Sequence, residues 1–190
     1  MINESALVRA MKREYKGLGY DITNATDRLY IRGAVWFAEL PWASVPGKVL
    51  GLIAEHMRGM PAPGETIHLQ SGGEPQRVME DIAATDLARW MDQASDLRGE
   101  IERTKLKAGN MVIYQDPSNL ECYGLLDYVA DIAEDAESAG EIYEDGRCRW
   151  WMADGIVTAL CSRPGSNNGL LHAHMTRLWP ALEDVDLLET

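Results

Sequence analysis

The amino-acid sequence predicts an α+β fold, in which a small mixed or antiparallel sheet, or two such sheets, packs with about five helices. Some segments repeat apolar residues every three or four positions, as helices do, and others alternate apolar and polar residues, as strands do. The two kinds of segment follow one another without a regular strand–helix–strand repeat, which favours α+β over α/β. With 190 residues, 46% of them apolar, the chain can bury a core as one domain, or as two packed lobes over residues 1–109 and 110–190.

The first expected element is an amphipathic helix that ends at Gly17 and Gly19. Its apolar residues recur at spacings of four, four and three, and basic residues lie mostly off that stripe. The segment RLYIRGAVWFAELP, residues 28–41, then alternates and is rich in aromatic and β-branched residues. It predicts one strand that ends at Pro41 or lies there at a sheet edge. The apolar stripe of the helix is Leu7, Met11, Tyr15 and Leu18.

Three further elements are expected before residue 109: a helix over residues 47–60, a short strand over residues 65–70 and a long helix over residues 83–107. The breaker run MPAPG separates the first two. The long helix has the most regular pattern in the sequence, and Lys105, Lys107 and Gly109 stand at its carboxyl end, where cations and glycine are favoured. Its apolar stripe is Ala83, Leu87, Trp90, Ala94, Leu97 and Ile101.

The second half of the chain begins with a buried strand in NMVIYQDP, residues 110–117. The sequence SNLE, residues 118–121, has the form of a capping box and predicts the start of another helix. Asp145 and Gly146 stand between two apolar and aromatic runs, which predicts a hairpin. IVTALC, residues 156–161, predicts a strand, and LLHAHMTRLW, residues 170–179, predicts a closing helix that Pro180 ends. The apolar stripe expected after the capping box is Cys122, Leu125, Val129, Ile132 and Ala136.

Charge is distributed unevenly along the chain, whose formal net charge is −12. Residues 1–107 hold 15 acidic and 14 basic residues, whereas residues 108–190 hold 15 acidic and 4 basic residues. No lysine or arginine occurs between Ala108 and Gly146. Like charges at this density repel one another, which costs stability that the fold must tolerate.

The acidic residues of this basic-free run are the candidate partner-binding site. Those on the helix expected after residue 121 recur at steps of three and four, and would share a face that points to water or to a partner. Such a face can compete with nucleic acid for a basic groove on another protein. The alternative is an acidic surface that serves solubility alone. The candidates are Asp127, Asp131, Glu134 and Asp135, with Glu137, Glu141, Glu144 and Asp145 extending the strip.

Composition and targeting signals favour a cytoplasmic protein. The apolar runs are shorter than a membrane helix needs, and the opening MINESALVRAMKREY lacks the apolar core of a signal peptide. The three cysteines, Cys122, Cys148 and Cys161, are an odd number at irregular spacing, which suits a reducing compartment and buried thiols better than a disulfide framework. No membrane partner and no cofactor are expected.

A small metal- or Cys/His-dependent enzyme is one alternative function. His172 and His174 could chelate a metal from a strand, but on the helix expected there they lie about 200° apart. Adding Cys148, Cys161 or His68 gives an irregular spacing that matches no zinc finger or ribbon. Nothing near the cysteines marks an activated nucleophile, and no glycine-rich loop has the context of a phosphate site. We therefore expect no metal site and no catalysis.

Direct binding of duplex DNA is not expected, because phosphates repel a protein of this net charge. Two local patches are nonetheless basic, and for both a solvated surface is the simpler interpretation. An oligomeric phage scaffold or interaction protein is a further alternative, since tryptophan is enriched in protein interfaces. The basic patches are Arg9, Lys12, Arg13 and Lys16 near the first helix, and Arg147 and Arg149 beside the predicted tryptophan hairpin at Trp150 and Trp151.

One stretch and the order of elements around it resemble a known family. GAVWFAELP, Gly33–Pro41, is similar to the Gly-x-Trp-Phe-x-x-Pro strand near the start of ArdA-type antirestriction proteins, with Val35 between Ala34 and Trp36 here. The elements expected over residues 29–138 follow the family's order, ending in an acidic helix. The resemblance implies a phage or mobile-element inhibitor that mimics bent duplex DNA with surface carboxylates and occupies the DNA groove of restriction enzymes, usually as an elongated dimer.

For this chain the resemblance places the DNA-mimicking carboxylates at Asp127, Asp131, Glu134 and Asp135. Members of the family tend to be acidic throughout, whereas residues 1–107 here are nearly neutral and the first helix is basic. An inhibitor that grips a defence protein through other contacts therefore remains open. The function expected from the sequence is a non-catalytic acidic protein that binds and inhibits a nucleic-acid-handling host defence protein, such as a restriction nuclease.

Overall fold

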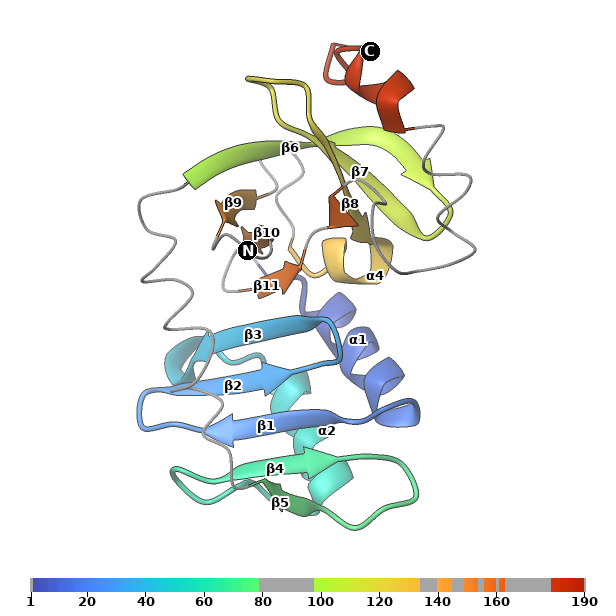
Figure 1. Cartoon of the computed structure of the whole chain (residues 1–190). Helices are drawn as coiled ribbons and strands as arrows, with labels where there is room; N and C mark the ends of the chain where they lie inside the picture. Colours follow the sequence, from blue (N-terminus) through green and yellow to red (C-terminus); the bar gives the residue numbers. More distant parts are fainter. Residues whose placement is uncertain are drawn as a thin grey trace.

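A computed structural model describes residues 2–78, 98–133, 140–144, 149–153, 156–159, 161–162 and 179–189. In the first half, the described elements begin with the helix α1 and end with the strand β5 (Figure 1). They are α1 (Glu4–Lys16), β1 (Tyr20–Asn24), β2 (Arg28–Arg32), β3 (Trp36–Pro41), the 3-10 turn η1 (Trp42–Ser44), α2 (Gly47–Met57), β4 (Thr66–Leu69) and β5 (Gln76–Val78).

In the second half, the described elements are mainly strands. They are β6 (Arg98–Ala108), β7 (Met111–Gln115), β8 (Cys122–Leu126), the short helix α4 (Asp127–Ala130), β9 (Gly140–Glu144), β10 (Arg149–Ala153), β11 (Ile156–Ala159) and β12 (Cys161–Ser162). Residues 179–183 form a helical turn near the C-terminal end. The α+β class is therefore confirmed, but within the described residues the expected number of about five helices is not.

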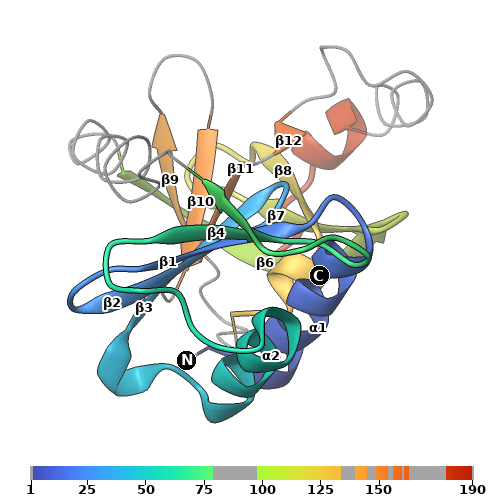
Figure 2. The same cartoon turned by 90° about the horizontal axis from the view of Figure 1, so that it is seen from below.

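The described strands all pair antiparallel, in the order β12-β8-β7-β6-β9-β10-β11-β3-β2-β1-β4-β5. The strand β6 joins two parts of this arrangement, because its first residues pair with β9 and its last residues pair with β7. The pairing of β11 with β3 brings strands from both halves of the chain into one sheet. Figures 1 and 2 show α1 and α2 together on one side of strands β1 to β4.

The main core lies between that side of the sheet and the two helices. Leu7 and Met11 of α1, Ile53 of α2, and Ile22 and Ile31 of the sheet are fully buried there. A second, smaller core covers the other side of the β7–β8 hairpin and contains Met111, Ile113, Cys122, Trp179 and Leu187. The hairpin is thus buried on both faces, which explains why all five residues of β7 are buried.

Several predicted elements are confirmed. The first helix and the helix after residue 46 form as α1 and α2, the strand around residues 65–70 forms as β4, and the strand in NMVIYQDP forms as β7. The strand β3 ends at Pro41. Antiparallel pairing of β9 with β10, which places Glu144 opposite Arg149, bears out the hairpin.

The long helix expected over residues 83–107 is wrong for its described part, since Arg98–Ala108 is the strand β6. The regular apolar spacing does not decide the structure here. The structure of these residues is decided by backbone hydrogen bonds to β7 and β9, because a helix here would leave the facing edges of both strands unpaired. Residues 83–97 lie outside the described part.

The helix expected after the SNLE sequence is also wrong over residues 122–126, which form β8. The carboxylate of Asp116 accepts hydrogen bonds from the Ser118 amide and hydroxyl, and the Asn119 side chain accepts one from the Glu121 amide. Leu120 takes a left-handed conformation with φ of 62°. These local bonds make a tight turn between two strands in place of a helix start. The helix α4 begins only at Asp127 and has four residues.

Residues 28–41 form a hairpin and not the single strand expected. The Gly33 amide donates to the Trp36 carbonyl, and a Cβ at Gly33 would lie 2.4 Å from the indole nitrogen of Trp36, so glycine is needed at this turn. Buried and exposed residues alternate again after the turn, but the buried ones are at even positions in β3, whereas they are at odd positions in β2. Trp36 and Ala38 therefore face the core, whereas Val35 is 44% exposed.

Two smaller predictions are also wrong. Leu18, expected on the buried stripe of the first helix, is 74% exposed because α1 ends at Lys16 and the chain turns at Gly17. Pro180, expected to end the closing helix, lies inside the helical turn of residues 179–183. Of the predicted helix itself, residues 170–178 lie outside the described residues.

Candidate functional site

The acidic residues predicted to bind a partner are only partly placed by the structure. Asp127 begins α4 and is half-buried, and Asp131 follows the last turn of that helix with its side chain 46% exposed. An oxygen of Asp131 lies 3.7 Å from the Arg103 guanidinium of β6, so its charge is partly compensated. Glu134, Asp135, Glu137 and Asp145 lie outside the described residues.

The remaining two candidates, Glu141 and Glu144, belong to the strand β9. Positions on a strand alternate between its two faces, so positions 141 and 144 belong to opposite faces. Position 141 pairs directly with Glu100 of β6, which sets two acidic residues opposite each other in the ladder. The continuous helical strip expected from residue 127 onwards is therefore interrupted, because α4 ends at Ala130 and the chain is in a strand again at Gly140.

A different group of carboxylates is assembled around Gln115, at the end of β7. The fully buried Gln115 amide donates from Nε2 to the carbonyls of Leu120 and Val185, at 3.1 and 2.9 Å, and its Oε1 accepts from the Leu187 amide at 2.8 Å. One side chain thus fastens the C-terminal segment to the β7–β8 turn. We call the carboxylates of that turn and that segment the acidic end; its residues are Asp116, Glu121, Glu183, Asp184, Asp186 and Glu189.

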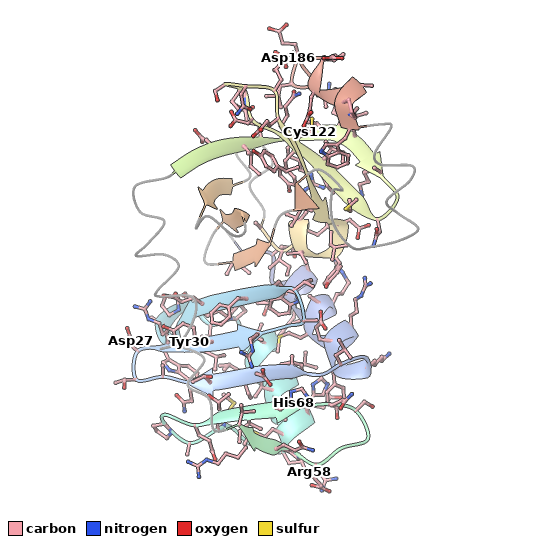
Figure 3. All side chains as sticks on the ribbon, in the orientation of Figure 1. Asp27, Tyr30, Arg58, His68, Cys122 and Asp186 are labelled. Carbon is pink, nitrogen blue, oxygen red and sulfur yellow. The ribbon has the colours of Figure 1, made fainter. Side chains whose placement is uncertain are left out.

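The acidic end is exposed on its C-terminal side. Asp184, Asp186 and Glu189 are exposed, whereas Asp116, Glu121 and Glu183 are half-buried. The Asp186 carboxylate accepts from the amides of Leu188 and Glu189, which shapes the segment so that Leu187 turns inward. Figure 3 shows Asp186 at the outer end of this region, beyond Cys122.

The thiol of Cys122 lies beneath the acidic end, and its surroundings make it unreactive. Burial, with the nearby Glu183 carboxylate as a second cause, raises the pKa of Cys122 to about 11. A thiol with this pKa is almost entirely protonated at neutral pH and is a poor nucleophile. Cys122 therefore acts as a core residue, packed with Trp179, whose indole nitrogen donates to the Cys122 carbonyl at 2.9 Å.

Sequence reasoning could have found these acids as a composition signal, since four of the last eight residues are acidic. It could not have joined them to Asp116 and Glu121, because the joining residue, Gln115, looks like an ordinary strand residue. The separation of 70 residues between Gln115 and Val185 is bridged only in the folded chain.

A second polar arrangement lies on the sheet face opposite α1 and α2. Asp21, His68 and Arg32 occupy directly paired positions on β1, β4 and β2. One oxygen of the Asp21 carboxylate lies 2.7 Å from His68 Nδ1, and the other accepts from Arg32 at 2.7 and 2.8 Å. Gly19 allows the imidazole to sit there, because a Cβ at Gly19 would lie 2.4 Å from the ring.

The Asp21–His68 pair is relevant to the alternative function of a small metal- or Cys/His-dependent enzyme. A carboxylate that orients a histidine is a common part of hydrolytic sites, which in covalent catalysis also have a hydroxyl or thiol nucleophile beside the ring. Among the described residues, the His68 ring is hydrogen-bonded to Asp21 and to no hydroxyl or thiol. Within the described ranges no three His, Cys, Asp or Glu side chains are grouped to hold a metal. His172, His174 and Cys148 lie outside them.

The basic residues of the first helix are placed as predicted, on the side of α1 away from its buried face. Arg9, Lys12, Arg13 and Lys16 are all exposed. Arg147 of the second patch lies outside the described residues, and Arg149, Trp150 and Trp151 belong to β10 between β9 and β11. No helix in the described part of the chain is long and apolar enough to cross a membrane.

Comparisons with known proteins do not identify a relative. No protein-family model matches the chain, no curated protein matches its sequence, and no solved structure matches its fold.

Proposed function

We propose that this protein is a non-catalytic binding protein whose acidic second half occupies a basic surface of another protein. The observation that carries the proposal is the fastening by Gln115, which gathers carboxylates from residues 116–121 and 183–189 at one end of the molecule. The charge asymmetry of the sequence supports it, because residues 108–190 hold 15 acidic and only 4 basic residues.

The partner class we propose is a nucleic-acid-handling protein, such as a nuclease of host defence. Basic grooves of the size and charge density that would hold this surface occur where proteins bind phosphates. An acidic protein seated in such a groove blocks nucleic acid by competition, and a DNA-mimicking carboxylate surface is one way of doing so. The resemblance of Gly33–Pro41 to antirestriction proteins points to the same class of partner.

The carboxylates of the acidic end and those of the strip predicted from residue 127 onwards differ in how freely they can approach a partner. The side chains of Asp184 and Glu189 are exposed at the acidic end and form no hydrogen bond or ion pair with a described residue, so they can approach a partner without first losing another contact. Asp131 would first have to leave Arg103. We therefore propose that the acidic end contributes more to binding than Asp127 and Asp131 do.

The test is capture of proteins from a bacterial lysate at low and at high salt. The tagged protein is compared with the double reversal Asp184→Lys and Glu189→Lys, and with a strip reversal Asp127→Lys and Asp131→Lys. The control is Glu55→Lys with Glu74→Lys, two exposed acids of the first half, which changes the net charge by the same amount. Circular dichroism and melting verify that each variant is folded.

We expect a nucleic-acid-binding protein to be captured at low salt, released by a short DNA duplex and lost in the Asp184/Glu189 variant but retained in the control. Salt should release it too, because exposed charges are screened beyond about 8 Å at physiological ionic strength. Capture that is equal in all variants, or that a DNA duplex does not displace, would contradict the proposal.

A further inference from the structure

A histidine and two tyrosines from three different elements meet where the end of α2 lies against α1 and β1. His56 of α2 stacks on Tyr15 of α1, with the ring centroids 3.6 Å apart and the ring planes 9° from parallel. The Nδ1 atom of His56 lies 3.0 Å from the hydroxyl of Tyr20 of β1. One imidazole therefore holds the last turn of α2 to both neighbouring elements.

The contact between His56 and Tyr20 is satisfied only when the imidazole is neutral. Tyr20 is 1% exposed, and among the described residues its hydroxyl has no hydrogen-bond partner other than His56 Nδ1. A hydroxyl that donates to Nδ1 satisfies both groups, and the imidazole proton is then on Nε2. Protonation places a second proton on Nδ1, so the hydroxyl has to accept, and its own proton is left buried without a partner.

The surroundings of the ring have opposing effects on its charge. Burial is the main cause that lowers the pKa of His56, while Glu55 attracts an imidazolium and Lys12 of α1 repels it. The carboxyl end of α2 favours a cation, but this effect is weak at a helix end in contact with water. The other titratable groups that face the ring, Tyr15 and Tyr20, are phenols, which titrate far above neutral pH. The packed arrangement therefore disfavours the imidazolium.

The last turn of α2 is the weakly held part of that helix. The buried residues of α2 all belong to its first two turns, and within the helix no residue after Ile53 is buried. The chain is fixed again at Pro61, whose carbonyl accepts a hydrogen bond from the Asn24 side chain at 2.8 Å. A movement of the last turn is thus confined to the residues between Ile53 and Pro61, and it leaves the core contacts of α2 in place.

We propose that His56 is a pH-sensitive latch, which holds the last turn of α2 on α1 and β1 while the imidazole is neutral and lets residues 54–57 open into water when it is protonated. Opening hydrates the imidazolium and gives the Tyr20 hydroxyl a water partner. Because the closed form disfavours the proton, the latch is closed above the ordinary histidine pKa of about 6.5 and opens as the pH falls below it. The inference goes beyond the proposed function, since it involves no partner and no carboxylate of the acidic end.

The test is hydrogen exchange of the full chain, followed by NMR at about pH 7.5 and about pH 5, on either side of the ordinary histidine pKa. Each rate is divided into the intrinsic rate for the same pH, which gives a protection factor. We expect the protection of amides 55–57 to fall about fivefold at the lower pH, the factor that one ordinary hydrogen bond contributes to an equilibrium. Protection of Leu52, Ile53 and β1 should fall less.

Three variants separate the latch from a general effect of acid. His56→Gln cannot titrate, so the fall in the last turn should be absent. Tyr20→Phe removes the buried donor, so the His56 ring should titrate at a higher pH than in the wild type, as measured from its ring-proton shift. The control is His68→Gln on the opposite face of the sheet, which should keep the wild-type fall in the last turn of α2. Circular dichroism verifies that each variant is folded.

The latch is wrong if the last turn keeps its protection at the lower pH, or if His56→Gln shows the same fall as the wild type. An unchanged His56 titration in Tyr20→Phe would equally overturn it, because the hydroxyl would then have no influence on the proton. An equal fall in the last turn, in Leu52 and Ile53 and in β1 would show that acid loosens the whole fold, and a local latch would again be ruled out.

Discussion

At the residue scale, the fold holds several polar side chains in places where their ionisation matters. His56, in the last turn of α2, stacks on Tyr15 with ring centroids 3.6 Å apart and has its Nδ1 3.0 Å from the Tyr20 hydroxyl. Burial is the main cause that lowers the pKa of His56, and the nearby Lys12 lowers it further while Glu55 opposes the shift. Burial also raises the pKa of Tyr20, so its hydroxyl stays protonated and can donate to the neutral imidazole.

A pH dependence of stability follows from His56. A histidine whose pKa is lower in the folded state contributes stability that is complete above its unfolded pKa, near 6.5, and is lost as the pH falls below that value. We expect His56→Gln, which cannot titrate, to lose less stability than the wild type between about pH 7 and pH 5. Urea unfolding of both proteins across this range measures the difference, and equal losses would show that the His56 proton does not contribute.

At the element scale, a buried carboxylate joins α1 to two other elements. Glu14 is 6% exposed, and its Oε1 accepts from the Trp36 indole nitrogen of β3 and from the Tyr128 hydroxyl of α4, both at 3.2 Å. Burial and Glu14 raise the pKa of Tyr128 to about 12, so the hydroxyl keeps its proton. The amide of Asn3 also donates to the Ile132 carbonyl at 2.6 Å, and the start of α1 is thereby tied to the segment after α4.

This junction predicts a coupled effect of substitution. We expect Tyr128→Phe to lower the free energy of unfolding by about 1–2 kcal/mol, because a buried carboxylate loses one of its two donors. In a Glu14→Gln background the same change should cost less, since no buried charge is left short of a donor. Chemical denaturation of the two single variants and the double variant measures the coupling. Additive effects would mean that the hydroxyl and the carboxylate do not interact.

At the scale of the whole molecule, Gln115 decides where the C-terminal segment lies. The Gln115 side chain makes three hydrogen bonds to backbone groups, at residues 120, 185 and 187. The Trp179 indole adds a fourth hydrogen bond, to the carbonyl of Cys122. Gly124 makes room for this contact, since a Cβ there would lie 3.3 Å from the Trp179 ring and 3.0 Å from the sulfur of Met111. The acidic end exists as a surface only because these contacts hold.

Replacing Gln115 should therefore affect stability and the acidic end together. We expect Gln115→Met, which keeps the size but not the hydrogen bonds, to cost roughly 2–4 kcal/mol, because buried backbone groups lose their partners. Hydrogen exchange at the Leu187 amide should accelerate more than exchange in β1. The matched control is Gln76→Met, at an exposed glutamine of β5, which should change stability by less than about 0.5 kcal/mol. Unchanged exchange at Leu187 would contradict this role of Gln115.

Local patterns were enough to predict part of the fold. The stripes of α1 and α2, the strands β4 and β7 and the end of β3 at Pro41 follow from residue periodicity and from proline chemistry, which act within a few residues. The α+β class and the concentration of negative charge in the second half were also visible in the sequence. The basic residues near the first helix could be placed on its exposed side for the same reason.

Only the tertiary structure decided the rest, because the deciding contacts join residues far apart in sequence. Arg98–Ala108 has a helix-like apolar spacing but is a strand, since β7 and β9 both need its hydrogen bonds. Ser118–Glu121 has the letters of a capping box, but the residues that follow it form the strand β8, which pairs with β7 and with the distant β12. The acidic end depends in the same way on Gln115, because no local sequence pattern predicts its hydrogen bonds to residues 185 and 187.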